Sequence, residues 1–381
     1  MRPQTKILLL LFLATLFSVP PARSCQYNVL ETGFVDMGRQ RYTLYVYHQQ
    51  STPLQTLDAI RSAANIQFAH SNIVVEMISI DGQGSRPALK YLERWPGSTL
   101  PTAILVSSEG RSMPIELNKP GSSLQKVFSR IVSSPAREEI LRAVSKNYGA
   151  VLMIEGRDRQ INRKARASAL AAIDNIRRKM VFMPKAIKHP PVLVTVSAQQ
   201  AEREKILLWS LGLTGRRPDT ACAAIVYGRA RWLGPLLRGE EITEENLVSI
   251  MRIIGADCEC GLDKRWLQGS MLPARWDDQL LARIVKNFNL DPENPIVKAE
   301  ISRIMRMPLA YGRNGNSSAK SSSTGPMAIP AAESARGAAI SLQDSSYVLS
   351  PNMRPVLIST IAFLLIVLAT GLILWLKFRN R

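Results

Sequence analysis

Hydrophobic residues run without interruption by charge in two stretches of the chain, one near each end. The first, residues 7–19, follows Arg2 and Lys6 and leads into small residues just before Cys25. A basic start, an apolar centre and a small-residue cleavage site are typical of a secretory signal peptide. We therefore predict a signal peptide over residues 1–24 and export of the rest of the chain.

The second apolar stretch, residues 355–376, contains no charged residue. At 1.5 Å per residue it is long enough to cross a hydrocarbon core of about 30 Å. Three basic residues follow directly in the tail 377–381, and such a flank stays in the cytoplasm. The pattern predicts a single-pass cell-membrane protein with a cytoplasmic C-terminus and an ectodomain in the periplasm or outside the cell.

Between the two ends, the spacing of apolar residues predicts two similar series of elements. The first has strands at 41–46, 72–80, 101–107 and 113–117, and helices at 57–68, 86–95, 122–132 and from Ser134. The second has strands at 150–154, 191–196, 222–227 and near 232–237, and helices at 163–180, 201–211 and 243–255. The repeated order β-α-β-α-β-β-α predicts an α/β fold with two tandem domains, over residues 40–147 and 148–262.

The remainder of the ectodomain changes in character. Apolar residues at helical spacing predict a helical extension over residues 263–307, with Asp277 capping its first helix. Residues 308–350 are rich in Ser, Ala, Gly, Asn and Pro. Such a composition buries too little apolar surface to offset its chain entropy, so we predict a flexible linker.

The first series resembles the thioredoxin fold most clearly at Leu100–Val106, followed by Glu109 and Gly110. In thioredoxin-like proteins a cis-proline opens the third core strand, and the resemblance implies that role for Pro101. The second series is a fainter match, because Thr220 stands where the proline should be. The whole chain also resembles uncharacterised, exported and membrane-anchored bacterial proteins of the planctomycete type, which suggest no reaction.

The chain departs from the thioredoxin pattern at the position of the catalytic cysteines. Catalytic members place Cys-x-x-Cys between the first strand and the first helix, where the helix N-terminus stabilises the thiolate. The matching stretches here, Tyr47–Pro53 and Glu155–Arg163, contain no cysteine. Neither half can carry out dithiol chemistry at that position.

Four cysteines leave several interpretations open. Cys258 and Cys260 could form a strained, labile disulfide with a redox or sensing role, or either could form a structural disulfide with Cys222. They could also bind a soft metal, but no third ligand is evident and we predict no metal, or they could be plain buried thiols. Cys25 could be lipidated, although Arg23 fits a lipoprotein signal poorly and ordinary cleavage is preferred.

Charge narrows the range of partners. The net charge is +19, and six of the basic residues lie in the two end segments, which contain no acid, so the rest of the chain keeps +13. A basic ectodomain suits an anionic envelope partner as well as simple solubility. Nucleic acid is not expected, because basic residues are dispersed and aromatic residues make up 6%. No motif for a cofactor, a small-molecule substrate or a hydrolase triad is present.

These observations favour a non-catalytic binding or accessory module built on degenerate thioredoxin-like domains and tethered to a membrane. The first alternative is a membrane-tethered thiol-disulfide oxidoreductase or thiol sensor that uses Cys258 and Cys260. The second is an accessory subunit of a membrane transport complex, in which the single apolar helix packs on a larger assembly.

Overall fold

The fold was analysed in a computed structural model. The structure describes residues 26–81, 86–118, 121–183, 185, 187–256 and 268–306. The predicted signal peptide, linker and transmembrane helix lie outside these residues, as do Cys25, Cys258 and Cys260. Within the described part of the chain, no helix is both long enough and apolar enough to cross a bilayer.

The first half folds around a four-stranded sheet in the order β2-β1-β3-β4. Its elements are β1 (Tyr42–His48), α3 (Leu54–Phe68), β2 (Ile73–Ser79), α4 (Arg86–Glu93), β3 (Thr102–Val106), β4 (Ser112–Ile115) and α5 (Leu124–Val132). Strand β1 runs parallel to β2 and antiparallel to β3, and β4 is antiparallel to β3. The predicted α/β order is confirmed for this half.

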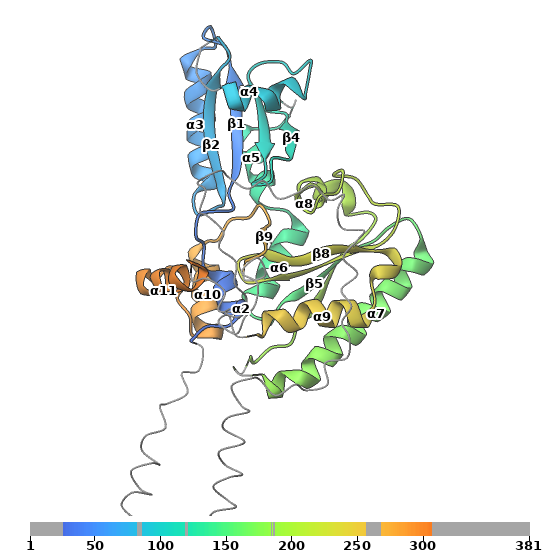
Figure 1. Ribbon diagram of the computed structural model, residues 1–381. Coiled ribbons are helices and arrows are strands. Elements are labelled where there is room, and N and C mark those ends of the chain that lie inside the picture. The colour runs from blue at the N-terminus through green and yellow to red at the C-terminus, as the bar shows by residue number, and fades with distance from the viewer. Residues whose placement is uncertain are drawn as a thin grey trace, which may run out of the picture. The chain divides into compact units, whose positions relative to one another are not determined.

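Helices cover both faces of the first sheet (Figure 1). Because side chains alternate along a strand, Leu44 and Val46 of β1 join the core beneath α3 and α5. Tyr45 and Tyr47 project to the other face and pack with residues of α4. The half is therefore a three-layer α/β/α unit.

The second half repeats this arrangement around a five-stranded sheet in the order β6-β5-β7-β8-β9. Its elements are β5 (Ala150–Ile154), α7 (Arg159–Lys179), η1 (Met180–Phe182), β6 (Val192–Val196), η2 (Ala201–Glu204), α8 (Lys205–Ser210), β7 (Cys222–Tyr227), β8 (Arg231–Arg238), η3 (Gly239–Glu241), α9 (Glu244–Ile254) and β9 (Ser270–Met271). Strand β5 is parallel to β6 and antiparallel to β7. Every residue of β5 and β7 is buried, because helices α7 and α9 cover one face and α6 (Pro135–Val144) covers the other (Figure 1).

The core of the second half also draws on distant parts of the chain. Helix α2 (Val29–Phe34), which precedes the first sheet in sequence, is buried in it, as are the apolar faces of α10 (Asp278–Phe288) and α11 (Pro295–Arg306). Helix α6 lies inside the predicted range 40–147, yet its Ile140 and Val144 pack into this second core. The helix that opens the second unit therefore precedes β5.

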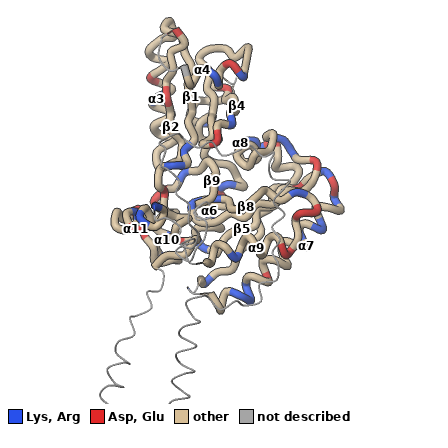
Figure 2. The backbone as a smooth tube through the Cα atoms, viewed as in Figure 1, with Lys and Arg blue, Asp and Glu red and all other residues tan. Residues whose placement is uncertain are grey.

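Helix α7 is the most basic element of the second half (Figure 2). It carries seven Lys or Arg residues and one acid, Asp174, over 21 residues. Its buried residues are Ala165, Ala169, Ala172 and Ile176, which form a narrow stripe of mainly small side chains facing α9 and the sheet. Asp158 begins the helix by accepting hydrogen bonds from the backbone N–H groups of Gln160 and Ile161.

A buried arginine fastens the N-terminal segment to the second sheet. Arg231 is 1% exposed, and its guanidinium donates to the carbonyl oxygens of Gly33 at 2.9 Å, Val35 at 3.0 Å and Gly269 at 3.1 Å. It also donates to the side-chain oxygen of Gln40 at 3.1 Å. Burial lowers the pKa of Arg231 to about 10, so the group stays charged at neutral pH. Four oxygens replace the water that the charge has lost.

A second buried arginine lies where α5 meets α6. Arg137 is 2% exposed and donates to the carbonyl oxygens of Arg130 at 2.6 Å, Ser133 at 2.8 Å and Pro273 at 2.9 Å, and to that of Ile131. Its Nε also donates to the hydroxyl of Ser134 at 2.8 Å. The side chain thus joins the end of the first unit, the start of the second and the segment after β9.

Candidate functional site

A hollow in the first half lies beside Pro101. The Leu100–Pro101 peptide bond is cis, and Pro101 directly precedes β3. A cavity of about 450 Å³ opens here; it is lined by the loop between α4 and β3 and by the end of β4, namely Trp95, Pro96, Gly97, Ser98, Thr99, Pro101, Thr102, Pro114, Ile115, Glu116, Leu117 and Asn118. We call this set of residues the Pro101 groove.

Trp95 forms one wall of the Pro101 groove. Its ring is fixed by a hydrogen bond from Nε1 to the hydroxyl of Ser112 on β4, at 3.4 Å, and the hydroxyl of Ser98 donates to the Trp95 carbonyl at 2.9 Å. The residue is nevertheless 38% exposed. An indole that is fixed by a hydrogen bond but still exposed is a good anchor for a partner, because it offers a large apolar surface at little cost in conformational entropy.

The edge strand beside the groove is protected against strand addition. β4 ends the order of the first sheet, and Pro114 stands at its centre opposite Ile104. Proline has no N–H to offer to an added strand, and for that reason it is common on edge strands. Pro114 therefore disfavours the addition of a further strand at the centre of β4.

The turn after β1, which carries the redox cysteines in catalytic thioredoxin-like proteins, is held here by hydrogen bonds. Tyr47 pairs with Thr102 across β1 and β3, so the turn after β1 lies at the same end of the sheet as Pro101. In that turn the backbone N–H of Gln49 donates to the hydroxyl of Thr52 at 3.1 Å, and that of Gln50 donates to Asp81 at 2.5 Å. The turn provides hydrogen-bonding groups and no cysteine.

The equivalent place in the second half has no room for a ligand. A Cβ atom added to Gly156 would lie 2.2 Å from the carbonyl carbon of Thr220, so the two backbones are in direct contact. The N–H of Arg157 donates to the carbonyl of Asp219 at 2.9 Å, and the guanidinium of Arg217 donates to the carbonyl of Gly156. The chain's own loop fills the position that the Pro101 groove leaves open.

Cys222 is the one cysteine within the described residues. Its side chain is buried, and its Sγ lies 3.7 Å from the carbonyl oxygen of Thr220. Burial raises the pKa of this thiol, which disfavours the reactive thiolate. Its predicted partners, Cys258 and Cys260, lie outside the described residues, so the structural disulfide and the redox pair stay predictions.

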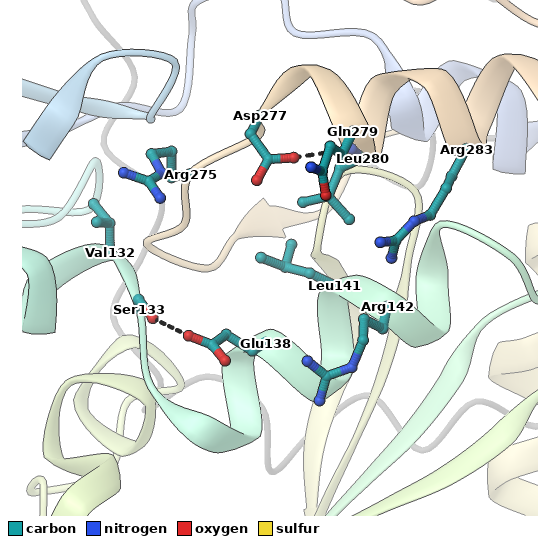
Figure 3. Close-up of a pocket in the computed structure, with 10 residues that line it drawn as sticks. All are labelled: Val132, Ser133, Glu138, Leu141, Arg142, Arg275, Asp277, Gln279, Leu280 and Arg283. Carbon is teal, nitrogen blue, oxygen red and sulfur yellow. Dashed lines mark hydrogen bonds between the residues drawn. The ribbon is translucent and has the colours of Figure 1, made fainter.

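A second, smaller cavity lies between α6 and α10 (Figure 3). It measures about 210 Å³ and is lined by Val132, Ser133, Glu138, Leu141, Arg142, Arg275, Asp277, Gln279, Leu280 and Arg283. Asp277 caps α10, as predicted, by accepting a hydrogen bond from the N–H of Leu280 at 2.9 Å. Glu138 accepts one from the hydroxyl of Ser133 at 2.5 Å. Three arginines and two carboxylates leave the lining of this cavity with a net charge of only +1.

Metal chemistry has no support in the described part of the chain, where no group of three or more His, Cys, Asp or Glu residues could hold an ion. The sequence matches no protein-family model and no curated protein.

Solved structures similar to this chain contain thioredoxin domains. One, the first two thioredoxin domains of Saccharomyces cerevisiae Eps1p, is 10% identical, covers 61% of this chain and 99% of its own, and has a TM-score of 0.21. Human ERp44 in its zinc-bound form is 12% identical over 56% of this chain and 54% of its own, with a TM-score of 0.22. The bb fragment of ERp72 is 14% identical over 57% and 88%, with a TM-score of 0.20. The thioredoxin-like description of each half rests on its strand order and directions.

Sequence reasoning missed most of the residues that shape these sites. Trp95 lies in the predicted helix 86–95 and Pro114 in the predicted strand 113–117, but α4 ends at Glu93, and nothing local in the sequence indicated that the two residues line one groove. Arg137 did have a signal in the sequence, because it begins a helical stripe that continues with Ile140, Leu141 and Val144. A charged residue in register with a buried face indicates a buried charge.

Proposed function

We propose that this protein is a single-pass membrane-anchored module, with its ectodomain in the periplasm or outside the cell, that binds a protein partner without catalysing a reaction. The proposal combines the two apolar end segments of the sequence with tandem thioredoxin-like units that lack the usual cysteines. Pro101 and the groove beside it serve as the binding site of the first unit. The second unit serves as a structural support.

One observation carries the proposal. The position where thioredoxin-like proteins carry their cysteines is open in the first half but holds no cysteine, and in the second half it is filled by the chain itself. A cavity of about 450 Å³ lies beside Pro101, whereas Gly156 and Thr220 are in backbone contact. An exposed indole, several prolines and mostly uncharged walls suit an extended segment of protein better than an anionic polymer. The oxidoreductase alternative depends on Cys258 and Cys260, and no described contact favours it.

Site-specific photo-cross-linking in membranes tests the binding role. A photoreactive amino acid at Asn118, an exposed residue of the Pro101 groove, is expected to capture a defined protein. The same probe at Ile66, which is 60% exposed on α3, is expected not to. Trp95→Ala should weaken capture from Asn118 roughly 30-fold, because an aromatic anchor contributes about 2 kcal/mol or more to binding.

The matched control is Leu54→Ala, which truncates an apolar residue that is 74% exposed outside the groove. It should leave capture unchanged, and both variants should melt at the temperature of the parent protein. Equal capture from the two probe positions, or capture that is indifferent to Trp95→Ala, would remove the Pro101 groove from the proposal.

A further inference from the structure

Two neighbouring apolar side chains protrude where α7 ends. Phe182 is 86% exposed and Val181 is 78% exposed, and they are the most exposed large hydrophobic residues in the described part of the chain. Both belong to η1, the short turn that continues directly from α7. Single apolar residues are common on protein surfaces, but an adjacent pair at a helix end forms an apolar patch that a partner surface could cover. We call Val181 and Phe182 the apolar tip.

Basic residues surround the apolar tip on both sides. Residues 175–190 contain five Lys or Arg residues and no acid, and Figure 2 shows Lys and Arg at this end of α7. Asp174 pairs with Arg177 and Arg178. Lys179 and Lys188 have no ion-pair partner within the residues that the structure describes, and both are exposed. An apolar pair with free cations beside it is complementary to an anionic bilayer surface, where acyl chains lie beneath negative headgroups.

The fold places both ends of the described ectodomain beside this tip. The ammonium group of Lys185, three residues after Phe182, pairs with Glu31 at 2.6 Å and donates to the carbonyl of Gln26, the first described residue. The side chain of Gln26 in turn donates to Glu300 of α11 at 3.2 Å. Helix α11 is the last described element before the predicted linker.

From these contacts we infer that the apolar tip inserts into the surface of a bilayer that contains anionic lipid. Phe182 and Val181 enter the boundary between headgroups and acyl chains, while Lys179 and Lys188 lie against the headgroups. The inference rests on the proposed membrane location and adds an orientation to it. The second unit then lies against the membrane, and its position is set by the tip as well as by the linker.

Hydrogen–deuterium exchange of the full-length protein in lipid nanodiscs tests the inference. Nanodiscs of phosphatidylcholine alone are compared with nanodiscs that also contain phosphatidylglycerol. Peptides that cover residues 177–188 are expected to exchange at least about fivefold more slowly in the anionic nanodiscs. The protection should decrease in 0.5 M NaCl, because salt at about that concentration screens surface charge.

The double variant Val181→Ser, Phe182→Ser should lose the protection, whereas Leu54→Ser, a matched change at an exposed residue of the first unit, should keep it. Equal exchange in the two lipids, in a protein that has entered both kinds of nanodisc, would overturn the insertion of the apolar tip and leave the proposed membrane anchor unaffected. Protection of the same peptides in lipid-free detergent at high protein concentration would also overturn it, in favour of contact between copies.

Failure of the anchor gives a different result. A full-length chain that stays soluble and enters no nanodisc would overturn the proposed membrane anchoring. Flotation of that soluble chain with phosphatidylglycerol vesicles would then test the apolar tip alone. If the double variant floats as well as the parent protein, the inference about the tip would be overturned.

Discussion

Replacing Arg231 with methionine is expected to lower the free energy of unfolding by about 3–5 kcal/mol. The guanidinium is buried and satisfies the carbonyls of Gly33, Val35 and Gly269. These acceptors belong to the backbone and remain when the side chain is replaced. Hydrogen bonds from a charged donor contribute about 1.5–3 kcal/mol each, and all of those from Arg231 are lost. The carbonyls of Gly33 and Val35 keep other donors, the N–H of Arg229 and the side chain of Gln268, and the apolar stem of methionine recovers only part of the packing. Urea unfolding of the full-length protein in mild detergent, followed by tryptophan fluorescence, measures the loss.

The matched control is Arg238→Met, at the exposed end of the same strand. It should change the free energy of unfolding by no more than about 0.5 kcal/mol. Equal effects of the two substitutions would show that the contacts of Arg231 with the N-terminal segment do not hold in solution. A large effect of Arg231→Met alone would show that α2 and its flanks are part of the second core.

Replacing Gly228 with alanine is expected to cost about 2–5 kcal/mol of stability. Gly228 has a φ of +52°, and an added Cβ atom would lie 2.5 Å from the carbonyl carbon of Gly33. The substitution therefore places a side chain in a left-handed backbone conformation and brings its Cβ atom into a clash with the backbone of Gly33. The N–H of Arg229 also donates to the Gly33 carbonyl at 3.0 Å, so the collision would break a second tie to the N-terminal segment.

Gly121→Ala separates these two effects. Gly121 has a φ of +71°, but an added Cβ atom would meet nothing within 4 Å. This variant should lose only about 1–2 kcal/mol, the cost of the left-handed conformation. The same urea titration compares the two variants, and losses of equal size would contradict the close approach of Gly228 to Gly33.

Local sequence signals predicted strands β1 to β8, but they missed β9, which lies within the predicted helical extension 263–307. They also did not show which core each helix would join. Strand β7 (Cys222–Tyr227) and helix α9 (Glu244–Ile254) agree with their predictions closely, because an unbroken apolar run and an N-capped helical stripe are strong patterns. Helix α7 begins four residues earlier than predicted, since Asp158 caps it. Helix α2 was missed although Asn28 and Glu31 form a capping box, which is a signal visible in sequence.

Long-range packing was beyond the sequence patterns. Nothing local indicates that Gly33 contacts Gly228, that Arg231 binds the carbonyl of Gly33, or that Trp209 of α8 packs against Tyr42 with ring centres 5.9 Å apart. Contacts between residues about 170 to 200 positions apart depend on the assembled sheets. The same holds for the Pro101 groove, where the resemblance indicated Pro101 and the fold supplied Trp95.

Reduction of insulin by dithiothreitol in the presence of the full-length protein tests the central claim, that the module binds without thiol chemistry, most directly. We predict a rate equal to the uncatalysed reaction, and equal rates for the parent protein and for Cys258→Ser. Turnover that is faster than background and disappears in Cys258→Ser would contradict the account and identify a thiol-disulfide oxidoreductase.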